Sequence, residues 1–262
     1  TIPAALDTSF GTDGMQVLSV SDSIDYIRSL KLLASGKILA VGAVNNHFGL
    51  LRFNSDLSLD TSFGTDGVVE TLVGNGEHAV DVIEHPEGGL LVIGKNGLVR
   101  YTDDGALDTS FGSGGIANGG NIDSSFFEGS SVAITADGRI VVGGDENGHW
   151  WKHGYYSLSG EFLSGGSDAN VYQDRALDAR SCGVYPLGDG TTVMVGSVRN
   201  DYFTSVRLDP EGNTIAQHQL PFTDDMSAES SMRLPDGKIL VIGRDDYQLY
   251  VGRFNQDGSV DT

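Results

Sequence analysis

The sequence predicts an all-β fold: a five-bladed β-propeller with four antiparallel strands per blade, in which an N-terminal strand closes the last blade. Three observations predict it, namely a turn that recurs five times, period-two patterning around each turn, and a strand count that closes a ring. We expect residues 1–262 to form a single domain.

A tight turn followed by an apolar run recurs along the whole chain. The turn glycines of its copies are Gly36, Gly88, Gly138, Gly190 and Gly237. Their spacings of 52, 50, 52 and 47 residues define five units of about 50 residues. Repeats of this length are typical of propeller blades built from four short strands.

Each unit contains short segments rich in Val, Ile and Tyr that are separated by Gly, Asp and Asn, and no helical period extends over 11 residues. In the second repeat we expect strands at Val68–Val73, Ala79–His85, Leu90–Ile93 and Leu98–Thr102. The third of these is nearly all apolar, as expected for a strand that adjacent blades cover on both faces.

The strand count predicts how the ring closes. A lone strand at Met15–Val20 precedes the first full set of inner strands, and the last repeat supplies three strands that finish at Phe254-Asn255. We expect the N-terminal strand to pair with the last blade as its fourth strand. Twenty strands would then leave no exposed sheet edge.

The charge balance excludes two classes of partner. The chain has 16 Lys and Arg against 36 Asp and Glu, a net charge of −20. Nucleic acids and anionic membranes are bound through basic residues, so neither is an expected partner. Adaptation to a salt-rich habitat is an alternative explanation of the acidity. The single cysteine, Cys182, excludes an intrachain disulfide and is expected to be a buried, unreactive thiol.

A second phrase carries a family resemblance. Leu-Asp-Thr-Ser-Phe-Gly occurs at residues 6–11, 59–64 and 107–112, and the chain finishes on Val260-Asp261-Thr262. Together with Gly-Lys-Ile-Leu and Arg-Phe-Asn, this phrase resembles the delta-60 repeat family of bacterial surface and secreted proteins, although repeats three and four have lost the signature. The resemblance implies a propeller-like fold, an extracellular or cell-surface location, usually within a larger protein, and no defined catalytic activity.

The repeated phrase has a structural interpretation. Its Leu and Phe would fill the space between blades, its Asp and Ser would bond turn amides, and its glycines would adopt left-handed turns. We predict no resident cofactor or metal. The alternative is a calcium site, since calcium prefers carboxylate oxygens; the candidate ligands are then Asp60, Asp66, Asp103, Asp104 and Asp108.

Candidate ligand-binding residues lie in the loops between the second and third strands of the blades. Four of the five loops pair amides or carboxylates with an aromatic ring, a combination that suits sugars. Alternatively, Asn, Asp and Gly form the hairpin turns and the aromatic rings pack inward. The candidates are Asn46, His47, Asp145, His149, Trp150, Trp151, Asn200, Tyr202, Asp246 and Tyr247. Because neighbouring strand residues point to opposite faces, Trp150 and Trp151 must face apart.

The mouth of the central channel is the second candidate region. Near matching points of the innermost strands the sequence has different polar residues, as in a repeat protein whose channel has specialised: Asp25, His78, Glu128, Arg180 and Glu229. Glu128 and Arg180 complete the candidate binding set. The alternative is that these are solvated charges lining a wet pore.

The favoured function is a non-catalytic module that binds a glycan or a peptide on a secreted or surface bacterial protein. One alternative is a glycoside hydrolase, for which Asp25, Glu128 and Glu229 are the only candidate carboxylates. Another is a spacer or assembly element. No local nucleophile motif is present, so we assign no catalytic residue.

Overall fold

The computed structural model describes residues 7–8, 13–18, 20–21, 23, 25–73, 78–95, 97–117, 127–146, 150–167, 180–198, 202–221, 227–245 and 247–262. Every regular element within these ranges is a β-strand, which confirms the all-β prediction. None of the described segments forms a helix long and apolar enough to span a bilayer.

The strands form five antiparallel sheets in chain order. The first two sheets are β1 (Tyr26–Leu32), β2 (Ile38–Val44), β3 (His47–Phe53) and β4 (Val68–Thr71), followed by β5 (Ala79–Glu84), β6 (Leu90–Gly94) and β7 (Gly97–Tyr101). The third is β8 (Phe127–Ile134), β9 (Ile140–Glu146), β10 (Trp150–Tyr156) and β11 (Phe162–Ser167). The last two are β12 (Arg180–Pro186), β13 (Thr192–Val198), β14 (Tyr202–Leu208) and β15 (Thr214–Pro221), then β16 (Ser227–Arg233), β17 (Ile239–Arg244) and β18 (Leu249–Phe254).

The four strands expected in the second repeat are confirmed to within two residues at each end. The first of them, β4, belongs to the first sheet, where it pairs with β3 as the outermost strand. The sequence repeat is therefore offset from the sheet by one strand, so that the first strand of the second repeat is the outer strand of the first sheet. This offset ties neighbouring sheets together covalently and by hydrogen bonds.

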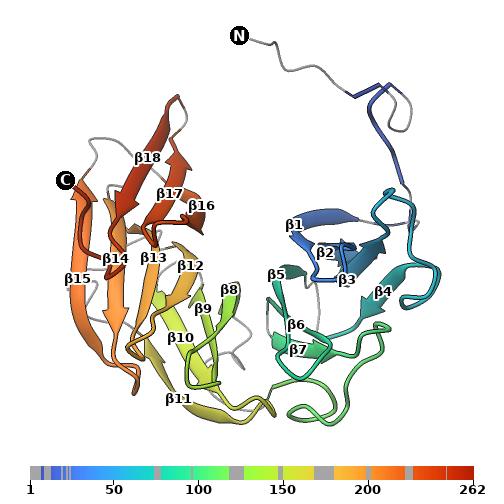
Figure 1. The fold of residues 1–262 in the computed structure, drawn as a ribbon, viewed down its shortest axis with the longest axis horizontal. Coiled ribbons are helices and arrows are strands. Elements are labelled where there is room, and N and C mark those ends of the chain that lie inside the picture. The colour runs from blue at the N-terminus through green and yellow to red at the C-terminus, as the bar shows by residue number, and fades with distance from the viewer. Residues whose placement is uncertain are drawn as a thin grey trace.

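The five sheets stand side by side along an arc (Figure 1). Contacts between successive innermost strands, β1 with β5, β5 with β8, β8 with β12 and β12 with β16, place these strands along the inside of the arc. Each gap between sheets is filled by apolar side chains from the facing strands. The third strand expected in the second repeat is β6, the second strand of its sheet; its expected burial on both faces is confirmed, since all five of its residues are buried.

The recurring turn has the same geometry in every sheet. Its glycine has a φ between +81° and +92° in all five copies, the left-handed region that favours glycine. Each of these glycines donates its N–H to the carbonyl three residues earlier, as Gly36 does to Leu33. The predicted turn positions are confirmed.

The Leu-Asp-Thr-Ser-Phe-Gly phrase acts as the predicted structural element. Phe63 and Phe111 are fully buried in successive cores between sheets. The Asp60 carboxylate accepts the Ser62 hydroxyl at 2.7 Å and the Lys37 ammonium and Arg52 Nε at 2.6 Å. The Arg52 guanidinium lies 4.3 Å above the Phe63 ring and donates to the carbonyl of Asp103 in the next sheet. The phrase thus locks one sheet onto the next.

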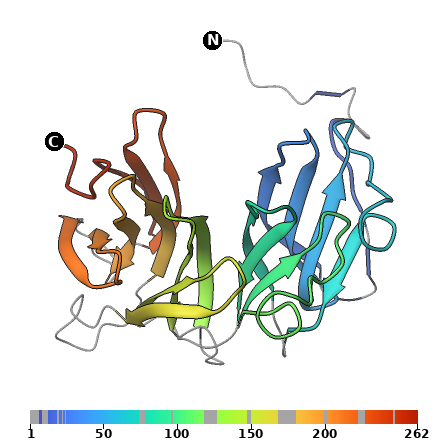
Figure 2. The same cartoon turned by 60° about the horizontal axis from the view of Figure 1, so that its bottom comes forward.

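The predicted closure of the ring is wrong. The fifth sheet has three strands, β16–β18, and the described residues 13–18 form no strand beside it. Val20 packs against Ala40 and Leu51 of the first sheet, while the Val17 side chain is 93% exposed. The described residues 13–18 and Val20 therefore lie on the side of the first sheet, and the arc is open between the first and fifth sheets (Figures 1 and 2).

The expectation of four strands per blade holds for three sheets. The second sheet, like the fifth, has three strands among the described residues, with an isolated bridge between Val99 and Ile116 where its fourth strand would lie.

Candidate binding site

Every innermost strand contains a β-bulge at the same place. The register with the second strand shifts between Ile27 and Ser29, and at the equivalent point of β5, β8, β12 and β16. A bulge leaves one residue unpaired and re-aims its side chain. The five bulged residues are Arg28, Val80, Ser130, Cys182 and Glu229, and all of them line one cavity.

The bulged positions can be recognised in the sequence by their constant spacing from the turn glycine. Each stands eight residues before the turn glycine of its own repeat. Of the channel residues predicted from the sequence, His78, Glu128 and Glu229 line the cavity. Asp25 does not line it, because its carboxylate accepts hydrogen bonds from Ser21 and the Asn45 N–H. Of the five bulged residues the sequence prediction included Glu229 and missed the other four, because hydrophobic periodicity does not mark a bulge.

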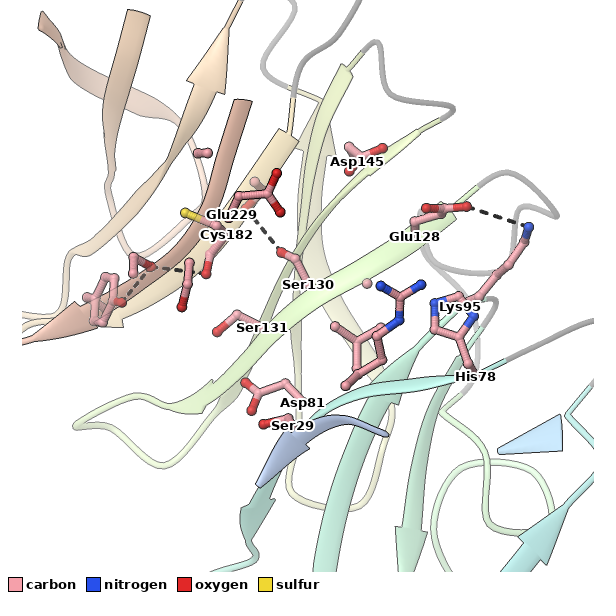
Figure 3. Close-up of a pocket in the computed structure, with 18 residues that line it drawn as sticks. Ser29, His78, Asp81, Lys95, Glu128, Ser130, Ser131, Asp145, Cys182 and Glu229 are labelled. Atoms are coloured by element: carbon pink, nitrogen blue, oxygen red, sulfur yellow. Dashed lines mark hydrogen bonds and ion pairs between the residues drawn. The ribbon is translucent and has the colours of Figure 1, made fainter. Parts of the chain in front are cut away.

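The cavity is about 790 Å³ in volume and mostly polar. It collects side chains from all five sheets, and Figure 3 labels ten of its lining residues, most of which come from the innermost strands. Its serine hydroxyls belong to Ser29, Ser130, Ser131, Ser181, Ser230 and Ser231, and its carboxylates to Asp81, Glu128, Asp145 and Glu229. Arg28, Lys95 and His78 contribute nitrogen groups on the side of the first two sheets.

Two ion pairs border the cavity. Lys95 Nζ lies 3.6 Å from Glu128 Oε1, joining the second and third sheets (Figure 3). In the fifth sheet Arg244 Nε lies 3.5 Å from Glu229 Oε1. Burial, reinforced by the nearby charge of Arg28, lowers the pKa of His78, so this imidazole is neutral at pH 7. The cavity therefore offers both donors and acceptors.

Asp81 is a carboxyl group of the cavity wall whose pKa departs from its ordinary value. Burial raises its pKa although two backbone N–H groups, of Val82 at 2.8 Å and Val132 at 3.1 Å, donate to it. Val132 belongs to β8, so Asp81 bridges two sheets at the cavity wall. Ser131 repeats this contact one sheet further on by accepting the N–H of Val184 at 3.4 Å.

Cys182 lies at the bulge of β12. Burial raises the pKa of its thiol to about 12, so the thiol stays protonated at pH 7. Its carbonyl accepts the Ser231 hydroxyl at 3.0 Å, and the Tyr185 hydroxyl donates to Ser231 at 2.7 Å. An unreactive thiol, as expected from the sequence, fits this environment.

The two adjacent tryptophans face apart, as strand geometry requires. Trp151 is fully buried in the core between the third and fourth sheets, whereas Trp150 is 38% exposed. Trp151 is therefore a packing residue with no surface to offer a ligand, which corrects its place in the candidate set. The inward-packing alternative describes it.

The other rim candidates are spread over separate hairpins. Asn46 is exposed with φ +65°, and His47 Nδ1 lies 2.5 Å from Glu70 Oε1. Tyr202 is half-buried and Tyr247 is 93% exposed. Of the candidates whose side chains the structure describes, it brings Glu128 and Asp145 together at the cavity. His149, Asn200 and Asp246 lie outside the described residues, and for Arg180 only the backbone, paired with Ser197, is described.

Comparison with known proteins agrees with this architecture. A family described as "Domain of unknown function (DUF5122) beta-propeller" matches residues 33–63, 92–111 and 234–262. The matched segments contain two of the five recurring turns and the buried Phe63 and Phe111. The chain is a β-propeller repeat protein. No curated protein matches it.

Several solved structures share the propeller fold at low sequence identity. A Bacteroides caccae protein of unknown function is 15% identical with a TM-score of 0.52, over 84% of this chain and 72% of that one. The WD40 domain of Neurospora crassa Pan2 is 13% identical with a TM-score of 0.60, over 90% and 64%. A Lactobacillus plantarum protein is 16% identical with a TM-score of 0.54, over 90% and 69%. The propeller thus spans about two thirds of the length of these structures.

Proposed function

We propose that this propeller is a non-catalytic glycan-binding module and that the ligand enters the cavity on which the inner strands converge. The single observation that carries the proposal is the repeated bulge, which aims one residue from each of the five sheets into one polar cavity. A bulge repeated at one position in every repeat re-aims a side chain in each blade toward a common point.

The chemistry of the cavity favours a sugar over an apolar ligand. Six serines provide hydroxyl groups that both donate and accept, and four carboxylates accept. A sugar presents hydroxyls that can bond to both kinds of group, whereas an apolar ligand would displace their water without offering a hydrogen bond in return, at a cost of about 1–3 kcal/mol for each group that loses a partner. Exposed Trp150 and Tyr247 would supply stacking surfaces to longer chains at the rim.

The resemblance to the delta-60 repeats supports a bacterial surface or secreted location, where glycans are abundant. The net charge of −20 suits an extracellular protein that must stay soluble and separate from acidic polymers. Calcium-assisted binding belongs to the same proposal as an option to be tested.

A glycan array followed by calorimetric titration tests the proposal. Glu229→Gln and Ser230→Ala change cavity groups, and Glu161→Gln and Ser55→Ala make the same changes at exposed positions away from the cavity. We expect the cavity variants to weaken binding about tenfold and the controls to leave it unchanged. Saturable binding to peptides alone would replace the glycan proposal, and binding to neither would favour a spacer. Repeating the titration with a chelator tests calcium.

One observation favours the hydrolase alternative. A glycosidase acid needs a raised pKa, and among the described carboxyl groups Asp81 has that shift. Asp25, by contrast, has a pKa lowered by its hydrogen bonds to Ser21 and Asn45 and lies off the cavity. Asp81 is, however, committed to two backbone N–H groups. If the wild-type protein released reducing sugar from a polysaccharide and Asp81→Asn did not, the hydrolase alternative would replace the binding proposal.

A further inference from the structure

The two ends of the arc carry large apolar side chains that face outward. In the fifth sheet Ile242, Leu249 and Val251 are 44%, 85% and 64% exposed. In the first sheet Ile27 and Leu30 are 46% and 68% exposed. We call these the fifth-sheet end face and the first-sheet end face.

The fifth-sheet end face repeats a surface that is buried elsewhere. Ile242 pairs with Val251 across β17 and β18 as Val41 pairs with Leu50 across β2 and β3. Val41, Leu50 and Phe48, the counterpart of Leu249, are completely buried against the second sheet. The fifth-sheet end face therefore has the composition of a surface made to receive a following blade.

The first-sheet end face repeats the opposite surface. Leu30 pairs with Ala40 as Val82 pairs with Val92, and Val82 is 1% exposed in the core against the first sheet. Ile27 pairs with Gly42 as the fully buried Ala79 pairs with Gly94. This face has the composition of a surface made to receive a preceding blade.

A third observation concerns the polar lock between sheets. Lys238 Nζ lies 2.7 Å from Asp261 Oδ1 and Arg253 also bonds to Asp261, as Lys37 and Arg52 bond to Asp60. Phe254 bridges to Val260 as Phe53 does to Leu59. Yet the Arg253 side chain is 50% exposed against 11% for Arg52, which reaches the carbonyl of Asp103 in the next sheet. Half of the lock is formed: Arg253 bonds to Asp261, but among the described residues it has no counterpart of the Asp103 carbonyl.

We propose that two further blades of the same repeat, carried on the same polypeptide, fill the opening between the two end faces. The size follows from the comparison structures. Five sheets that span 64–72% of those propellers correspond to a complete ring of about seven, within the usual range of blade numbers. A second copy would bring five sheets to an opening that holds about two.

The test supplies the missing blades from the chain itself. Val260-Asp261-Thr262 corresponds to Leu59-Asp60-Thr61, so a second copy of residues 62–167 placed directly after Thr262 continues the phrase in register. It adds an outer strand for the fifth sheet and copies of the second and third sheets. We expect the extended chain to be monomeric, to bind an apolar fluorescent dye at least about threefold less than the 262-residue chain, and to melt about 10 °C higher.

Paired substitutions locate the effect. Leu249→Asp with Val251→Asp should cancel the gain in melting temperature, whereas Leu163→Asp with Ile215→Asp, at exposed positions outside the end faces, should preserve it. Amide exchange in β16–β18, which needs no variant, should slow in the extended chain. Unchanged dye binding, melting and exchange in the extended chain would overturn the proposal.

Two results on the 262-residue chain would also overturn it. Spontaneous disulfide formation between Leu30→Cys and Val251→Cys within a monomer would show that the two end faces close on each other. Sedimentation as a dimer that Leu249→Asp dissociates would show that a second copy covers them. Monomeric sedimentation with strong dye binding and no crosslink supports the proposal.

Discussion

Asp81 in the second sheet accepts the backbone N–H of Val132 in the third sheet at 3.1 Å, so one carboxylate of the cavity wall also holds two blades together. Its other oxygen accepts the N–H of Val82 at 2.8 Å. Binding groups and blade contacts are thus built from the same residues. A substitution in the channel must be judged by its effect on stability as well as on binding.

Replacing Asp81 by Asn should destabilise the fold at acidic and neutral pH. The amide keeps one acceptor oxygen but turns a donor toward the second N–H, which costs about 1–3 kcal/mol. Chemical denaturation measures the loss, with Asp236→Asn in an exposed turn as the control. An Asp81→Asn protein as stable as wild type would mean that the bridge between sheets contributes nothing.

The pH dependence of this loss has a defined sign. Because the pKa of Asp81 is raised in the folded state, the native protein binds more protons than the unfolded chain above pH 3.8. The contribution of Asp81 to the free energy of unfolding therefore falls as the pH rises from 3.8 toward the folded pKa. The difference between wild type and Asp81→Asn should shrink over that range.

Asp60 should show the opposite pH dependence. Hydrogen bonds from Lys37, Ser62 and Arg52 lower the pKa of its carboxylate, so its contribution is complete above pH 3.8 and is lost as the pH falls below that value. Asp60→Asn should cost about 1.5–3 kcal/mol at pH 7 and progressively less in acid. Urea titrations of both proteins between pH 2 and 7 measure it. If the difference in unfolding free energy between the two proteins did not vary with pH, the negative charge of Asp60 would not be the source of the stabilisation.

Much of the fold could be predicted because the repeat is recognisable from its recurring residues. Positive φ at the turns demands glycine in every copy, and buried second strands demand unbroken apolar runs. The closure failed for a physical reason that strand counting ignores. The strand count assigned Met15–Val20 to the last blade, which lacked a fourth strand. The position of Val20 is instead decided by its packing on the first sheet.

The candidate site was predictable only in part. A bulge leaves no mark in hydrophobic periodicity, so Ser130 and Cys182 look like ordinary strand residues. The constant offset of eight residues from the turn glycine would have found them. Trp151 shows the reverse error, since an aromatic ring beside a polar loop suggested a binding residue although the neighbouring sheet covers it.

Two glycines with similar φ values should respond differently to alanine. Gly36 has φ +81° and open space around a Cβ, so Gly36→Ala should cost only the backbone strain, about 1 kcal/mol. At Gly89, with φ +78°, a Cβ would come 2.2 Å from the Tyr101 carbonyl oxygen, which forces β6 and β7 apart. Thermal melting should show a much larger loss for Gly89→Ala. Equal losses would mean that the turn adjusts without strain.

The two tryptophans separate stability from binding. Trp151 is fully buried between the third and fourth sheets, so Trp151→Ala should leave a cavity and cost about 3–5 kcal/mol. Trp150 is 38% exposed, so Trp150→Ala should change stability by less than about 1 kcal/mol. Any loss of glycan affinity in Trp150→Ala then reports a rim contact, because the fold is unchanged. Chemical denaturation and titration of the same preparations measure both quantities. A destabilised Trp150→Ala protein would place that ring in the packing and remove it from the proposed site.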